Sequence, residues 1–358
     1  MNISISTYQV KSGDTLQSVS AKLGISAEAL KRYHNTYCDL KNLIGHNLNG
    51  IHEILIPPYE KIAEIKESQI EASLIQNLPS VYLTTKFYAS NYEVAERFEQ
   101  DDRENFEVSY SISVNLRETM DKGFVAELKN SGFRKNNQDS DDKVSLLSIA
   151  CIESISPILF LIPAQGKIKG FYDHKSIIKK FESKRSDLED FFVGEVAKSY
   201  FNKFHASLTN EAFLLKRFSS TLLYQVLFPE MDWFRKRKGW EDNFYFISNS
   251  FSLKCTFEIE YNHDNPDTVE TTIHGNSIDD CSLQELIIGA KFEEIRKENV
   301  PGKIQIKYTT DKITKRLLRA DAEISLWHED EMYSKHILTL VEKKQEKEFK
   351  KFSTLVEE

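Results

Sequence analysis

The sequence predicts an α+β protein, in which a small β-α-α-β module is followed by a larger domain. In that domain an antiparallel β-sheet, flat or curved, carries a central helical insertion packed on it. Two observations lead to this fold class. Apolar and polar residues alternate through stretches such as 106–116 and 251–261, while the region between them has helical spacing. Strands and helices that are segregated along the chain are typical of antiparallel sheets with helices on one side.

The composition is that of an ordinary globular protein with a sizeable core. The chain has 358 residues, of which 40% are hydrophobic and 28% charged, with 23 Phe and 15 Tyr. This length allows one small and one large domain, or three small ones. The net charge of −8 disfavours nonspecific binding to nucleic acid or to anionic membranes, so neither is expected as a partner.

The start of the chain shows no basic segment, apolar segment or cleavage site of a secretory signal. No run of about eighteen apolar residues predicts a membrane span. The four cysteines are widely spaced, which favours free thiols in a reducing compartment over a disulfide framework or zinc site; they are Cys38, Cys151, Cys255 and Cys281. We therefore expect a cytoplasmic location in the producing cell.

The first module has the most specific pattern in the chain. Its opening follows Y-x-V-x-x-G-D-T-L, a short strand, a glycine turn and a helix start that Asp14 or Thr15 can cap. Gly24 is placed to end that helix, and Ser26 to cap a second one. The segment 54–57, Ile-Leu-Ile-Pro, predicts a closing strand.

With these motifs, residues 6–58 resemble a LysM domain. The resemblance implies a β-α-α-β fold that binds glycans containing N-acetylglucosamine, such as peptidoglycan or chitin, in a shallow groove between two loops. The implied first wall is Gly13, Asp14, Thr15 and Leu16. The second wall is expected within 43–51, where the residues assigned to it are Ile44, Gly45, Leu48 and Ile51.

The rest of the chain divides by its patterns. Residues 59–78 have one apolar stripe and predict a linker helix. The α+β domain follows at 79–342, with strands over 79–171, helices over 172–229, and strands with one helix over 240–342. Residues 343–358 form a charged tail. Within the helical region, Ser186 and Glu189 suggest a capping box and Thr209 a further cap. In the preceding strand region, residues 136–142 suggest a polar loop.

No catalytic constellation is found in the sequence. The motifs H-E-x-x-H, G-x-S-x-G, G-x-G-x-x-G and the P-loop are all missing from it. Glu258 and Glu260 share one face of a strand, which we interpret as a solvated face, and Cys255 as a core residue. No catalytic residue, metal site or cofactor is predicted.

An aromatic and basic cluster between the helices and the later strands predicts a contact surface for a partner. Such residues can bind a protein, a lipid headgroup or nucleic acid. The alternative is a basic loop with aromatic rings tucked beneath it. The cluster consists of Trp233, Phe234, Arg235, Arg237 and Trp240.

The combined features resemble LysM proteins associated with bacterial contractile injection or type VI secretion systems. This implies a non-catalytic binding or adaptor protein. It would recognise peptidoglycan or another N-acetylglucosamine-containing glycan, or dock onto proteins of an injection apparatus. It could also be delivered to the periplasm or the outside by a dedicated secretion system. Two alternatives remain: a delivered wall-degrading enzyme with an unrecognised active site, and an exported glycan binder.

Overall fold

The computed structural model describes residues 6–100, 104–120, 123–139, 141–292 and 300–344. The chain forms two compact units, Met1–Asn77 and Leu78–Glu358. The second is built on a large antiparallel sheet with helices, so the predicted α+β class is confirmed. Among the described residues, no helix combines the length and apolar character needed to cross a membrane.

The first unit has β-α-α-β order with one helix added. β1 pairs antiparallel with β2, so that Ser6 lies opposite Ile56. Thr15 caps α1 through its side chain, and Gly24 ends that helix at a φ of 67°, a left-handed conformation that favours glycine. Its elements are β1 Ser6–Gln9, α1 Leu16–Leu23, α2 Ala27–Tyr37, the 3₁₀ turn η1 Leu40–Asn42, β2 Glu53–Ile56 and α3 Tyr59–Gln76.

The helix predicted as a linker, α3, belongs to the first unit. Ile62 and Ile65 pack against the small core of this unit, which contains Leu30 and Ile54. The Gln69 amide also donates a 2.9 Å hydrogen bond to Oγ of Ser26 at the start of α2. The first half of α3 therefore extends the module rather than merely connecting it to the next unit.

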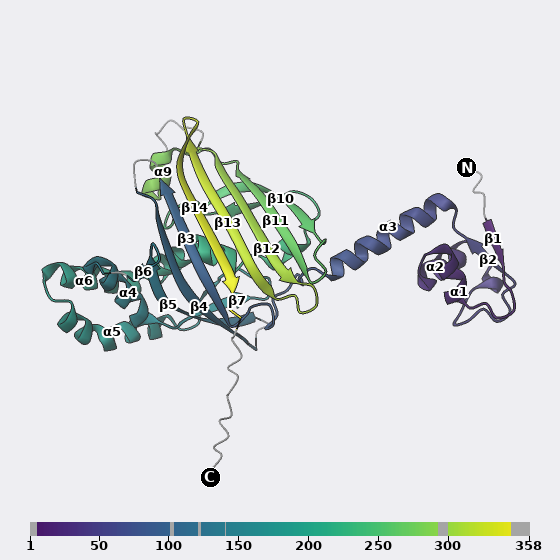
Figure 1. Cartoon of the computed structure of the whole chain (residues 1–358), viewed down its shortest axis with the longest axis horizontal. Coiled ribbons are helices and arrows are strands. Elements are labelled where there is room, and N and C mark those ends of the chain that lie inside the picture. Colours follow the sequence, from purple (N-terminus) through teal and green to yellow (C-terminus); the bar gives the residue numbers. More distant parts are fainter. Residues whose placement is uncertain (1–5, 101–103, 121–122, 140, 293–299, 345–358) are drawn as a thin grey trace, which may run out of the picture. The chain divides into compact units, whose positions relative to one another are not determined.

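The second unit contains one sheet in which all neighbouring strands are antiparallel, in the order β8-β7-β5-β4-β3-β14-β13-β12-β11-β10-β9, with β6 paired to β5 (Figure 1). The strands are β3 Asn91–Gln100, β4 Phe106–Glu118, β5 Gly123–Lys135, β6 Gln138–Asp139, β7 Ile158–Pro163, β8 Gly170–Phe171, β9 Trp240–Phe244, β10 Leu253–Asn262, β11 Thr268–Ser277, β12 Gly302–Asp311, β13 Leu317–His328 and β14 Glu331–Glu342.

The sheet consists of two meanders joined at β3 and β14. These strands pair from Tyr92 opposite Glu342 to Gln100 opposite Ser334. The two outer edges of the sheet approach each other, which shows that the sheet is curved. Lys167, in the loop between β7 and β8, lies with its Nζ 2.7 Å from the carboxylate of Asp242 on β9.

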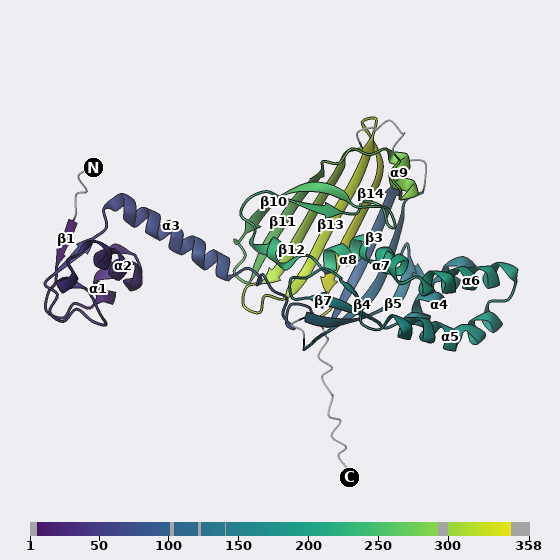
Figure 2. The ribbon, with the colours of Figure 1, turned by 180° about the vertical axis from the view of Figure 1, so that it is seen from behind.

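Helices cover one face of this sheet. α7 and α8 lie in front of the strands (Figure 2), and buried residues of α8 such as Val226 and Leu227 belong to the same core as Leu338 and Leu340 of β14. The helical elements of this unit are α4 Lys143–Ile155, α5 His174–Phe191, α6 Glu195–Thr209, α7 Glu211–Ser219, α8 Leu222–Leu227, η2 Met231–Arg235 and α9 Leu283–Ile288.

Several local predictions were wrong. The proposed capping box at Ser186 and Glu189 lies inside α5, where Arg185 pairs with Glu189 one turn later at 2.6 Å and the helix continues. The side chain of Asn210, not Thr209, caps α7. Within the loop expected at 136–142, residues 138–139 form the short strand β6, whereas 136–137 form a turn and 141–142 lie outside helices and strands.

The expected strand region 79–171 begins too early, since residues 81–87 are irregular and the first strand of the sheet, β3, starts at Asn91. Residues 345–358 of the expected tail lie outside the described residues.

Candidate functional site

The loop predicted as the first glycan wall is held by Asp14. One carboxylate oxygen of Asp14 accepts hydrogen bonds from the Tyr8 hydroxyl and from the backbone N–H of Lys11, both 2.9 Å long. The other oxygen lies 3.2 Å from Nζ of Lys22. The Lys11 N–H, the Tyr8 hydroxyl and the Lys22 ammonium together lower the pKa of Asp14 to about 2. Asp14 is therefore a structural anchor that is ionised at neutral pH.

The residues next to Asp14 have different structural roles in this loop. Gly13 has a φ of 89°, which the turn requires and which side-chain-bearing residues rarely adopt. Thr15 and Ser18 form a reciprocal capping box at the start of α1. The Leu16 side chain is buried in the small core, so the surface available to a glycan here comes from Gly13, Asp14 and Thr15.

The residues predicted for the second wall are mostly core residues. Ile44, Leu48 and Ile51 are buried, and only Gly45 of the four is exposed. The Asn35 side chain fixes this segment, because its Oδ1 accepts from the N–H of Ile44 at 2.8 Å and its Nδ2 donates to the Ile44 carbonyl at 3.0 Å. A ligand at this wall would meet the backbone and Gly45 rather than these three apolar side chains.

Comparison with known proteins identifies this first unit. Residues 8–40 match the LysM domain family. The N-terminal unit carries a LysM domain. This supports a general role in binding peptidoglycan or other glycans that contain N-acetylglucosamine. The first wall lies inside the matched LysM residues, whereas the second wall, at 44–51, lies beyond them.

Comparisons with curated proteins and with solved structures do not indicate a function. No curated protein matches the sequence. A solved structure on lipid–protein interactions in lipovitellin is similar over 71% of this chain at 8% identity, with a TM-score of 0.33, a likeness that carries no argument. This chain spans 24% of the length of that protein.

The aromatic and basic cluster outside the LysM domain lies largely in the core. Trp233 and Phe234 are 2% and 0% exposed, so their rings cannot form a contact surface in the folded protein. Trp240 stacks on Phe257 at 5.4 Å. Arg235 donates through Nε to the Pro79 carbonyl at 2.7 Å, and thus fixes the start of its own unit, whereas Arg237 is exposed.

The cysteines and glutamates considered as possible catalytic residues lie in surroundings typical of structural residues. Burial raises the pKa of the Cys255 thiol to about 12 and that of Cys281 to about 11, so neither forms a thiolate at neutral pH. Glu258 and Glu260 lie on the exposed face of β10, as expected. Among the described residues, no group of three or more His, Cys, Asp or Glu side chains could hold a metal ion.

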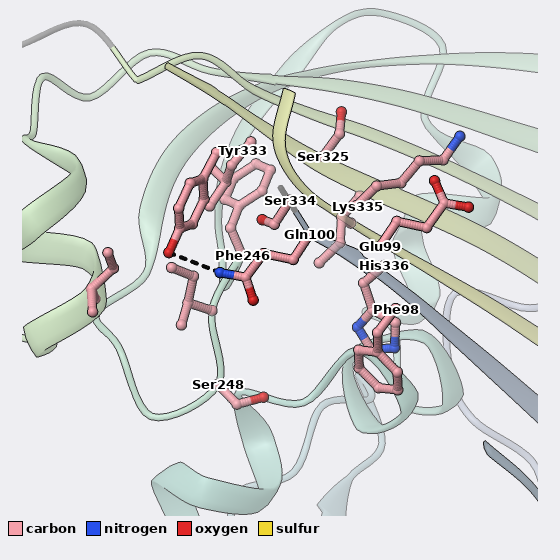
Figure 3. Close-up of a pocket in the computed structure, with 14 residues that line it drawn as sticks. Phe98, Glu99, Gln100, Phe246, Ser248, Ser325, Tyr333, Ser334, Lys335 and His336 are labelled. Carbon is pink, nitrogen blue, oxygen red and sulfur yellow. Dashed lines mark hydrogen bonds between the residues drawn. The ribbon is translucent and has the colours of Figure 1, made fainter. Parts of the chain in front are cut away.

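A cavity of about 330 Å³ opens at one end of the sheet, beside the pairing of β3 with β14 (Figure 3). Side chains of β3, β14 and the segment after β9 surround it. Gln100 donates to the Tyr333 hydroxyl at 3.2 Å, and Ser248 approaches from the opposite side. Phe246 forms part of its wall.

His336, which lines this cavity, belongs to a hydrogen-bonded group of three residues. Nε2 of His336 is 2.8 Å from Oε2 of Glu96, while the Tyr110 hydroxyl donates to Oε1 of Glu96 at 2.6 Å. The side chains of His336 and Glu96 are 18% and 13% exposed. Sequence reasoning missed this group, because its members come from three strands and no local spacing connects them.

Proposed function

We propose that the protein is a non-catalytic glycan-binding adaptor whose LysM domain recognises peptidoglycan or a related N-acetylglucosamine glycan. The match of residues 8–40 to the LysM family carries this proposal. The bonds of Asp14 to Tyr8, Lys11 and Lys22 support it, because they hold the first wall in one conformation before a ligand arrives. A preorganised loop loses little conformational entropy on binding.

The arrangement of the second unit favours binding over wall cleavage. A muramidase needs a protonated glutamate to donate to the leaving oxygen. Glu96, beside the cavity, instead has both oxygens bonded to protein side chains, one to the Tyr110 hydroxyl and the other to the His336 ring. The buried thiols Cys255 and Cys281 are likewise unsuited to nucleophilic attack at neutral pH.

The setting in which the adaptor acts is a second part of the proposal. Its four free cysteines are typical of a reducing compartment, and they motivate a cytoplasmic location in the producing cell. From there the protein would dock onto a contractile injection apparatus or be delivered by it. In that setting the LysM domain would hold either a protein of the apparatus or the cell wall.

The experiment is retention of the full chain on insoluble peptidoglycan, compared with a Gly45→Arg variant. Gly45 suits this test because it is exposed, and a Cβ added there meets no atom within 4 Å. An arginine should therefore obstruct the second wall without disturbing the core. Asp14 and Leu16 are poorer choices, since replacing either would disturb the fold of the loop.

Gly170→Arg is the matched control, because an added Cβ also meets no atom within 4 Å there and the position lies in the other unit. Retention of the wild type and of Gly170→Arg, together with loss for Gly45→Arg, would support glycan binding through this groove. A folded wild type that is not retained would refute it and turn attention to protein docking. Release of soluble wall fragments would refute the non-catalytic assignment.

A further inference from the structure

Several polar groups that carry no charge line the cavity beside β3 and β14, together with Glu99, Lys335 and His336. The amide of Gln100, the phenol of Tyr333 and the hydroxyls of Ser248 and Ser334 are among its lining residues. Figure 3 shows the side chains of Lys335 and Glu99 directed away from the centre of the cavity. Their charges are balanced elsewhere, by Glu323 at 2.9 Å and Arg97 at 2.8 Å respectively.

The titratable groups around His336 are hydrogen-bonded to one another. His336 faces the Glu96 carboxylate on β3, and Tyr110 on β4 donates to the same carboxylate. Because Nε2 of His336 is bonded to Glu96, its Nδ1 is the remaining hydrogen-bonding atom of the ring. Within the part of the chain that the structure describes, Nδ1 has no hydrogen-bond partner.

Apolar side chains complete the lining. Phe98 is stacked between the His336 ring at 4.1 Å and the Phe106 ring at 4.8 Å, so both of its faces are covered by these neighbours. The Phe246 ring lies against Gly302, where an added Cβ would come within 2.4 Å of it, so glycine leaves the space that this ring occupies. Ile287 of α9 also contributes to the wall.

From this lining we propose that the cavity binds one ring of a neutral saccharide. A ring with hydroxyl and acetamido groups can bond to Gln100, Tyr333 and Nδ1 of His336 while an apolar ring face packs on an aromatic side chain. A charged ligand would lose its hydration without meeting an opposite charge. The choice of N-acetylglucosamine as the probe rests on the proposed LysM function. The proposal of a saccharide site in this cavity rests on its lining residues alone.

The test is saturation-transfer NMR on the full chain carrying Gly45→Arg, so that the LysM groove is obstructed. Three probes differ in charge: neutral N-acetylglucosamine, cationic glucosamine and anionic N-acetylmuramic acid. N-acetylglucosamine should give a signal, and the two charged sugars should give none. No signal from N-acetylglucosamine, or equal signals from all three sugars, would overturn the proposal.

Variants assign any signal to the cavity. Gln100→Ala and Tyr333→Phe should each weaken binding about fivefold, as expected for one hydrogen bond of about 1 kcal/mol. Tyr172→Phe is the control, because Tyr172 is exposed and lies outside this lining. Affinity unchanged in both cavity variants would overturn the proposal. Retention of the wild type on peptidoglycan reports separately on the LysM groove, so the two proposals fail independently.

Discussion

The imidazole of His336 and the carboxylate of Glu96 are joined by a 2.8 Å hydrogen bond although 240 residues separate them in the sequence. The bond crosses the junction at which β14, the last strand, pairs with β3, the first strand of this sheet. Tyr110 adds β4 to the same group. One partly buried carboxylate therefore connects three neighbouring strands and holds His336, a lining residue of the cavity.

Replacing Tyr110 by Phe should destabilise the second unit. The change removes a 2.6 Å hydrogen bond to a partly buried carboxylate and leaves the ring, which stacks on Phe133 at 5.0 Å. Hydrogen bonds to charged groups contribute about 1.5–3 kcal/mol, so a loss of this size in the free energy of unfolding is expected. Denaturant unfolding followed by tryptophan fluorescence is suitable, because all three tryptophans lie in this unit. A loss below about 0.5 kcal/mol, typical of neutral surface changes, would contradict the prediction.

Asp14 should make the LysM loop sensitive to acid only at very low pH. Its pKa of about 2 in the folded chain is below the ordinary value of 3.8, so folding favours the ionised form. This stabilisation is complete above pH 3.8 and is lost as the pH falls through about 2. The backbone amide signal of Lys11, followed by NMR, should titrate with a midpoint near 2 and should lose this step in Asp14→Asn. A midpoint near 3.8 would show that the network is not formed.

Local patterns in the sequence were enough to predict much of the first unit and many strands. The turn at Gly13 and the caps at Thr15 and Ser26 depend on neighbouring residues, and the structure has all three. β4 likewise alternates as expected, with Tyr110, Ile112 and Val114 buried. Such features follow from backbone geometry within a few residues.

The sequence alone did not predict which strands distant along the chain would pair. One charged residue on the core-facing side hides the alternation of β3, because Glu96 occupies a position between Val94 and Phe98 where an apolar residue would be expected. Its partners are Tyr110 and His336, on strands that only the fold brings together. The same limit explains why the cavity was not foreseen.

His34 should be essential to the stability of the first unit, although no local pattern pointed to it. Its ring is 1% exposed, and Nδ1 accepts from the Leu55 N–H at 3.0 Å while Nε2 donates to the Asn42 carbonyl at 2.8 Å. In His34→Ala both of these part-buried hydrogen bonds are lost, at a cost of about 0.5–1.5 kcal/mol each. Hydrogen exchange of the Leu55 amide in the full chain should accelerate accordingly. Arg32→Ala, on the exposed side of α2, is the control that should leave this amide unchanged, and equal exchange in both variants would refute the role of His34.

Gly275→Ala tests whether the tryptophan cluster is a packed core. A Cβ at Gly275 would lie 2.6 Å from the ring of Phe257, which itself contacts Trp233 at 5.5 Å and Trp240 at 5.4 Å. Because the ring must shift, we expect a loss of about 1–3 kcal/mol in unfolding free energy and altered native tryptophan fluorescence. Gly170→Ala should change neither, since an added Cβ there meets no atom within 4 Å. Unchanged fluorescence and stability in Gly275→Ala would mean that Phe257 is loosely held and that the cluster is not tightly packed.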